Sequence, residues 1–255
     1  MSEIFSSSRF GILLRNDAIS GYRSLLTASA TLAGLLLVGV LLSRGEISYH
    51  EYFYLAEFVT MLLIWGPIAS SRSFKELHNK TENEAYLLLP ASALEKICAR
   101  LLFATLFFYA YLLVFIGLTS VVVESLNAML FGQQNQRFNP LDAMEWHIFG
   151  HFLVIQSLYF LGAAWFRKNH FIKTTLAITI ACIGLALFTL AVLRFVLIST
   201  FDDFEMSVDN LYSLYQGVID AAAMGLTVLY FIGLPLICWL AAWLRVRETQ
   251  VSDGV

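Results

Sequence analysis

Charged residues are scarce in this chain of 255 residues. Lysine, arginine, aspartate and glutamate together make up 14% of it, whereas hydrophobic residues make up 58%. A soluble domain carries about a quarter charged residues. The apolar residues also gather in runs that are too long for a soluble core. The composition therefore excludes an ordinary soluble domain and predicts an integral membrane protein.

Cysteine is also rare. The three cysteines, Cys98, Cys182 and Cys238, lie in or beside apolar runs, and none has a CxxC partner. This pattern favours small buried hydrophobic side chains over a disulfide framework or a zinc site, so we expect no bound metal. Charged residues interrupt the first 24 positions, so we expect no secretory signal peptide.

Several catalytic and nucleotide-binding motifs are missing. The chain has no G-x-x-x-x-G-K-[ST] loop to cradle phosphates, no H-E-x-x-H and no G-x-S-x-G. We therefore expect that this chain is not an enzyme and that it does not bind ATP through a G-x-x-x-x-G-K-[ST] loop. An intramembrane enzyme would have to rest on Glu57 alone, and we rank that hypothesis last.

Six apolar runs are present, each close to the roughly 20 residues that a helix needs to cross a bilayer. They show no β-barrel alternation, so an all-α protein with six transmembrane helices is predicted. Pro67 and Pro235 lie inside two runs, where each permits a kink. The six runs are 25–42, 53–70, 101–123, 147–166, 174–198 and 221–244.

Basic residues lie in alternate loops. They concentrate in the N-terminal segment, in the loop 71–100, around residues 167–173 and in the C-terminal tail. The other loops hold only Arg44 and Arg137. The positive-inside rule then predicts that both termini and the loop 71–100 are cytoplasmic.

Residues 1–24 are predicted to form an N-terminal unit of their own ahead of the transmembrane domain 25–255. Apolar residues recur there at helical spacing, while basic residues such as Arg9 and Arg23 fall on the other face. This pattern predicts an amphipathic helix in the bilayer interface, with a frayed N-terminus as the alternative. The apolar positions are Phe10, Leu13, Leu14, Ala18, Tyr22 and Leu25.

Two loops on the other side are long. The loop 124–146 is polar and is predicted to be an exposed excursion. In the loop 199–220, four apolar residues repeat at helical spacing, which predicts a short helix lying on or dipping into the outer face. These residues are Leu211, Leu214, Tyr215 and Val218.

The polar loop 71–100 carries two helix starts. Thr81-x-x-Glu84 and Ser92-x-x-Glu95 both match the capping box, in which a hydroxyl and a glutamate satisfy free backbone N–H groups. Pro90 separates them. We therefore predict a short helix over about 81–88, a break, and a second helix that starts at Ser92 and enters the membrane.

A few polar residues fall within the spans. Glu57 and Arg194 both belong to the outer half, so one could neutralise the other. With Gln156, His147 and His151 they could line an outer gate; the alternative is a structural ion pair with side chains that reach the headgroups. The spacing of the two histidines places both on one helical face, where they could bind haem or handle a quinone, or form an interfacial pair.

The loop 71–100 resembles the first cytoplasmic loop of bacterial ABC (ATP-binding cassette) transporter permeases of the second type. The N-terminal segment and the six spans are similar too, so the resemblance covers the whole chain. The loop residues that carry it are Phe74, Glu76, Leu77, the stretch from Tyr86 through Pro90 to Ser92, Glu95, Lys96 and Arg100.

The resemblance implies the transmembrane subunit of an exporter in the bacterial plasma membrane. A separate cytoplasmic ATPase would bind ATP and magnesium, so this chain would hold no cofactor. The subunit would pair with a second copy or with a different permease, contact membrane lipid, and bind no nucleic acid. It also implies an interfacial helix over about 9–24 and re-entrant outer helices within 201–220. The coupling helix that docks on the ATPase would include Thr81, Glu82, Glu84, Tyr86, Leu87 and Leu88.

Residue chemistry in the predicted coupling helix agrees with this role. Glu82 and Glu84 lie in its first turn, where negative charge suits the helix dipole. The apolar cluster 86–89 follows, and an apolar patch rimmed by charge commonly marks a protein contact. The alternative is that these side chains pack under the loop.

Overall fold

The computed structural model describes residues 6–43, 53–74, 91–132, 137–140, 143–200, 216–217 and 220–252. These residues are almost entirely helical, and no strand occurs among them. The predicted coupling helix 81–88 lies outside the described residues, as does most of the predicted outer helix in 199–220. The site residues that fall there are Thr81, Glu82, Glu84, Tyr86, Leu87, Leu88 and Pro90.

Within the described residues, the bounds of seven α-helices and two π-helical segments are defined. Five helical stretches in this part of the chain are long and apolar enough to cross a membrane, as a helical, multi-pass protein requires. The predicted first span, 25–42, lies within α1, which is not among the five, so a total of six stays a prediction. The helices are α1 Ser7–Ser43, α2 Phe53–Ser71, α5 Ala93–Leu102, α6 Phe108–Phe131, α7 Ala143–Trp165, α8 His170–Thr200 and α10 Leu234–Ser252, with π-helices η1 Phe103–Phe107 and η2 Leu229–Gly233.

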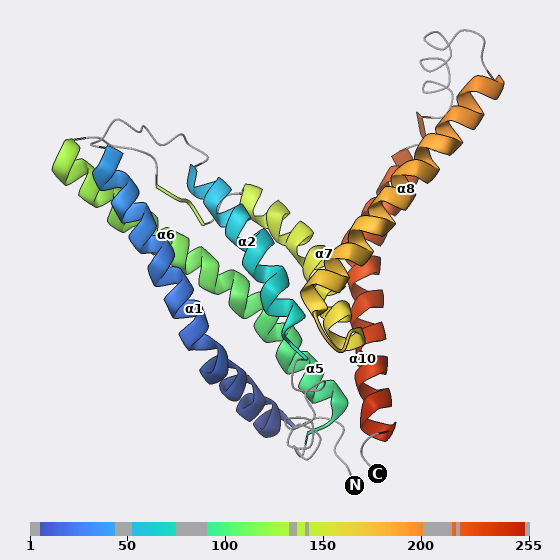
Figure 1. Cartoon of the computed structure of the whole chain (residues 1–255), viewed down its shortest axis with the longest axis horizontal. Coiled ribbons are helices and arrows are strands. Elements are labelled where there is room, and N and C mark those ends of the chain that lie inside the picture. The colour runs from blue at the N-terminus through green and yellow to red at the C-terminus, as the bar shows by residue number, and fades with distance from the viewer. Residues whose placement is uncertain are drawn as a thin grey trace.

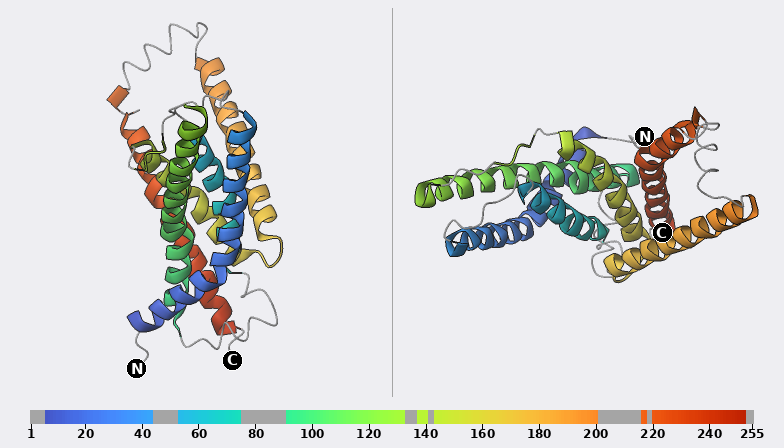
Figure 2. Two further views of the ribbon diagram at one scale, coloured as in Figure 1. Left: turned by 90° about the vertical axis from the view of Figure 1, so that its left-hand side faces the viewer. Right: turned by 90° about the horizontal axis from the view of Figure 1, so that it is seen from above.

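The first helix, α1, joins two parts that were predicted as separate units. It continues without interruption from Ser7 to Ser43, so the boundary at residue 24 is not a helix end. Figure 2 shows a bend in α1, with its N-terminal turns set at an angle to the rest. Farther along, the Ser29 and Tyr111 hydroxyls lie 2.5 Å apart and join α1 to α6.

The third predicted span is much longer than expected. Helical backbone continues from Ala93 through η1 to Phe131, and Gly132 ends it with a left-handed φ of 69°. At 1.5 Å per residue, 39 residues extend about 58 Å, well beyond a bilayer core of about 30 Å. The prediction that 124–146 is an exposed loop is therefore wrong for its first part. Glu124 is instead a buried helical residue, because α6 packs against α2 at this point.

The π-helix η2 ends at Gly233, two positions before Pro235. Proline has no N–H, so the carbonyl of Phe231 cannot receive its usual helical bond. A π turn is one way in which a helix accommodates such a defect. The predicted irregularity at this proline therefore takes the form of a π-helical segment, Leu229–Gly233.

Two apolar cores hold the helices together. The first lies between α2, α6 and α7, where Gly66 allows close contact: a Cβ there would meet the Phe152 ring at 2.6 Å. The second lies where α5, α7 and α10 meet. The buried members of the first are Tyr54, Phe58, Met61, Leu62, Phe108, Tyr109, Leu112, Ile116 and Phe152. Those of the second are Phe74, Ile97, Phe160, Ala163, Ala164, Ala242 and Val246.

The whole molecule is open rather than closed. Figure 1 shows α8 diverging from α2 and α7, while the first turns of α1 and the last turns of α10 lie together at the lower end of the view. We call this the terminal end of the bundle. In α8, every residue from Thr179 to Phe195 is exposed, although this part of the helix is largely apolar. A helix that is apolar and exposed on every side is suited to lipid or to a partner helix.

Candidate functional site

The start of α5 is fixed by a complete capping box. Ser92 caps the helix: its hydroxyl accepts from the Glu95 backbone N–H at 3.2 Å. Glu95 Oε2 in return accepts from the Ser92 backbone N–H at 2.7 Å. The sequence-based prediction of this helix start is confirmed, since α5 begins at Ala93. The carboxylate of Glu95 is fully buried.

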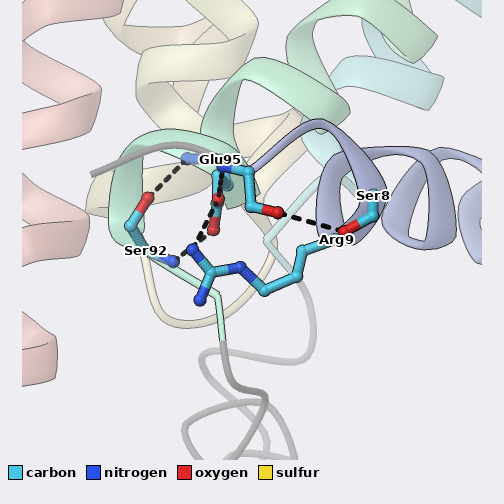
Figure 3. Close-up of polar contacts among 5 residues, drawn as sticks. Ser8, Arg9, Ser92 and Glu95 are labelled. Atoms are coloured by element: carbon cyan, nitrogen blue, oxygen red, sulfur yellow. Dashed lines mark hydrogen bonds and ion pairs between the residues drawn. The ribbon is translucent and has the colours of Figure 1, made fainter. Parts of the chain in front are cut away.

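Glu95 also binds the start of α1. Its Oε1 accepts from the Ser6 backbone N–H at 2.5 Å and from Arg9 Nη2 at 3.2 Å. Figure 3 shows the Arg9 side chain reaching across from α1 to the Glu95 carboxylate beside Ser92. Both carboxylate oxygens are therefore satisfied, one by α5 itself and one by a segment more than 85 positions away.

Arg100, two turns along the same helix, joins two further segments. Its Nε forms an ion pair with Asp17 of α1 at 3.0 Å, and its Nη1 donates to the Ser73 carbonyl at 2.8 Å. Ser73 belongs to the turn that follows α2. One guanidinium therefore holds α1, α5 and the end of α2 together.

Phe74 is the last described residue before the loop, and it is firmly held. It is 1% exposed, and its ring packs edge-on against Phe160 of α7, with 4.9 Å between ring centroids. Ile97 of α5 and Val246 of α10 belong to the same core. Lys96, the other loop position named from the sequence, is buried within α5.

These contacts form one site at the terminal end, which we call the junction. It anchors both ends of the intervening segment 75–90 to buried parts of the bundle. The junction consists of Ser6, Arg9, Asp17, Ser73, Phe74, Ser92, Glu95 and Arg100.

The residues on the buried and exposed faces of α1 differ from those predicted. Arg9 was assigned to the face away from the apolar contacts, yet it binds the buried Glu95. Asp17, which the sequence-based assignment left without a role, is buried against α5. The exposed face instead presents Ile12 and Ile19. Asp17 is the single acidic residue of α1, and that isolated charge is the signal that could have pointed to a basic partner.

The predicted intramembrane polar cluster does not form as an ion pair. Both carboxylate oxygens of Glu57 are buried and have no hydrogen-bond partner among the described residues, Arg194 included. Arg194 is exposed on α8, which diverges from α2 (Figure 1). Gln156 is fully buried in α7, and its amide oxygen and nitrogen have no protein partner.

The two histidines are exposed. His151 Nδ1 lies 3.3 Å from the Tyr230 hydroxyl, and its ring packs beside Phe231 in η2. Within the described ranges, no three His, Cys, Asp or Glu side chains are grouped so as to hold a metal. The haem- or quinone-binding alternative for His147 and His151 stays a prediction.

Comparisons with family models, curated proteins and solved structures find no significant match to this chain.

Proposed function

We propose that this chain is the transmembrane subunit of an ATP-driven ABC exporter, in which segment 75–90 receives force from a separate ATPase. The observation that carries the proposal is the junction, because it ties both ends of that segment to α1, α2, α5 and α7. Because both ends of segment 75–90 are held in this way, a force on the segment would move these helices.

The chemistry of the junction suits the transmission of force. Its links are buried ionic hydrogen bonds and an aromatic contact, which resist small displacements better than exposed pairs do. Glu95 and Arg100 lie on one helix and each holds α1, so a push at Ser92 reaches α1 as well as α5. No bond is made or broken in this step; ATP hydrolysis belongs to the partner.

The shape of α1 supports an interfacial position for its first turns. Arg9 and Asp17 face α5, whereas Ile12 and Ile19 are 68% and 56% exposed on the other side. The exposed Arg15 adds a basic group to the isoleucine face. An apolar face flanked by basic residues fits the boundary between headgroups and acyl chains. In this proposal, the terminal end of the bundle lies at the cytoplasmic surface of the bacterial plasma membrane.

The open form of the chain favours assembly with a second transmembrane subunit. Beyond its first turns, α8 has exposed apolar side chains on all sides. A translocation path between two subunits would use such a surface, either with a second copy or with a different permease.

The test is purification of the tagged chain from its own membranes in a mild detergent. We expect a Walker-motif ATPase to copurify, identified by mass spectrometry and by ATP hydrolysis. The triple variant Glu82→Lys, Glu84→Lys, Leu87→Asp reverses two charges and removes one apolar side chain from the predicted contact. It should reduce the recovered ATPase roughly tenfold, which corresponds to a loss of about 1.4 kcal/mol in binding free energy.

A matched control reverses acidic charge on the side predicted to face outward, through Asp202→Lys and Asp203→Lys. This variant should recover as much ATPase as the unaltered chain. The proposal fails if no ATPase copurifies, or if the triple variant in segment 75–90 and the outer control retain it equally.

A further inference from the structure

A second group of polar side chains lies at the opposite end of the bundle, where α2 begins and α6 ends. It consists of Tyr54 of α2 with Glu124 and Asn127 of α6, and we call it the Glu124 cluster. Their exposed fractions are 3%, 3% and 1%. None of the three was predicted as a site residue from the sequence, and none takes part in the junction.

A short hydrogen bond joins the two helices in this cluster. The Tyr54 hydroxyl donates to Glu124 Oε1 at 2.5 Å. Distances of about 2.5–2.7 Å are typical of a hydroxyl that donates to an ionised carboxylate. The bond therefore fixes one oxygen of the Glu124 carboxyl group, Oε1, and the side chain is shielded from water.

The remaining polar atoms of the cluster have no hydrogen-bond partner among the residues that the structure describes. Glu124 Oε2 and both polar atoms of the Asn127 amide, Oδ1 and Nδ2, are buried and make no hydrogen bond. The two residues are three apart on α6, a spacing that puts their Cβ atoms about 5–6 Å from each other. Two oxygen ligands therefore lie on one helix face beside a buried charge. Leaving such groups unpaired is costly.

A loop segment covers the neighbouring part of this interface. The Phe138 N–H donates to the Ser120 hydroxyl at 3.3 Å, and the Phe138 ring packs 5.6 Å from that of Phe58. Ser120 lies one turn before Glu124 on α6. Residues 137–140 thus lie against the α2–α6 interface, and Arg137 at their start is exposed. Among the described residues, no ion pair to Glu124 is formed.

We propose that the Glu124 cluster binds a small monovalent cation through Glu124 Oε2 and Asn127 Oδ1. Carboxylate and amide oxygens are suitable ligands for hard cations. The cluster supplies one carboxylate, which balances the charge of a monovalent cation. A divalent cation would need a second acidic group. Water could fill the free hydrogen bonds but would leave the charge uncompensated. This inference does not rest on the transport proposal.

The test uses the purified full chain in detergent, with thermal unfolding followed by tryptophan fluorescence. Sodium, potassium and methylammonium chloride are titrated separately, with N-methylglucamine chloride holding the ionic strength constant. We expect a saturable rise in Tm with at least one of them, and the comparison tells an inorganic ion from a primary ammonium group. Glu124→Gln and Asn127→Ala should weaken the apparent affinity roughly tenfold or more.

Glu57→Gln is the matched control, because it replaces another buried carboxyl group, one turn away from Tyr54 on α2. It should leave the titration unchanged. Equilibrium dialysis of radioactive sodium or rubidium gives a direct readout, and Asn127→Ala carries the test if Glu124→Gln does not fold. The proposal is overturned if the Tm of the unaltered chain does not change with cation concentration. It is equally overturned if the Tm of the Glu124→Gln chain rises with cation concentration as much as that of the unaltered chain. It is also overturned if Arg137→Ala lowers the Tm as much as Glu124→Gln, since Arg137 would then be the counter-charge.

Discussion

The Glu95 side chain illustrates how one residue can serve two levels of structure. Its contact with Ser92 is local and completes the cap of α5, while its contacts with Ser6 and Arg9 join α5 to the start of α1. A buried carboxylate is stable only when it is paired and hydrogen-bonded. Each of its two oxygens has a partner, so the charge can remain at this position.

Removing the Glu95 carboxylate should destabilise the junction. Glu95→Ala leaves two backbone N–H groups and the Arg9 guanidinium without their acceptor, so we expect the free energy of unfolding to fall by about 2–3 kcal/mol. Ser92→Ala, which removes only the cap, should cost about 1 kcal/mol. Unfolding in mixed detergent and dodecyl sulfate, followed by circular dichroism, measures both changes.

The control for this prediction is Glu248→Ala. Glu248 pairs with Arg245 at 2.6 Å, but its side chain is 67% exposed. Exposed pairs contribute little, so the change should stay within about 0.5 kcal/mol. Equal effects of Glu95→Ala and Glu248→Ala would show that burial of the Glu95 carboxylate does not matter.

Among the helices, the α7–α8 pair is held by close approach at one glycine. A Cβ on Gly162 would lie 1.9 Å from Thr174 Oγ1 and 2.8 Å from its Cγ2. Thr174 is 4% exposed, and its hydroxyl donates to the His170 carbonyl at 2.7 Å. A β-branched side chain in a helix has little rotamer freedom, so Thr174 cannot easily move aside.

Adding a side chain at Gly162 should therefore push α8 away from α7. We expect Gly162→Ala to lower the free energy of unfolding by about 1–3 kcal/mol, and Gly162→Val to lower it more. Gly184→Ala in α8 is the matched control, because no atom lies within 4 Å of the added Cβ. It should leave stability unchanged or raise it slightly. A Gly162→Ala chain as stable as the control would contradict this packing.

The two kinds of helix contact explain the open shape of the bundle. α7 packs closely against α2 and α10, with Gly66 and Gly150 admitting the rings of Phe152 and Phe231. α8 touches its neighbours only near its start and then diverges (Figure 1). Its apolar surface is thus left for lipid or for another subunit.

At the scale of the whole molecule, the start of α1 and the end of α10 both lie at the terminal end of the bundle (Figure 1). If that end is cytoplasmic, single cysteines introduced at Glu82 and Ser252 should react with a membrane-impermeant maleimide only after the cells are opened. Cysteines at Gln134 and Asp203 should react in intact cells. The background variant replaces Cys98, Cys182 and Cys238 by serine or alanine.

Two labelling results would contradict the predicted topology. Reaction of the Glu82→Cys chain in intact cells would place segment 75–90 outside the cytoplasm and would remove the ATPase contact. Opposite labelling of Glu82→Cys and Ser252→Cys would mean an odd number of spans between them. The expected pattern would support the even number predicted from the basic residues.

The fold class could be read from the sequence because it depends on local properties. The boundaries of α2 and the start of α5 agree closely with the apolar run 53–70 and with the Ser92 capping box. The end of α6 was placed too early, because the polar residues that follow Val123 resemble a loop. Glu124 and Asn127 are in fact buried, and Tyr54 of α2 binds Glu124. Local pattern alone does not reveal such a cover.

The amino-acid sequence by itself determined that the chain is helical and membrane-spanning and where most helices begin, since hydropathy, length and capping act within a few residues. The tertiary structure decided which polar side chains are buried and what they bind. Asp17 meets Arg100, Arg9 meets Glu95 and Tyr54 meets Glu124 across 70 or more positions of the chain. These pairs depend on which helix faces come together, and a face acquires its partner only when the helices pack.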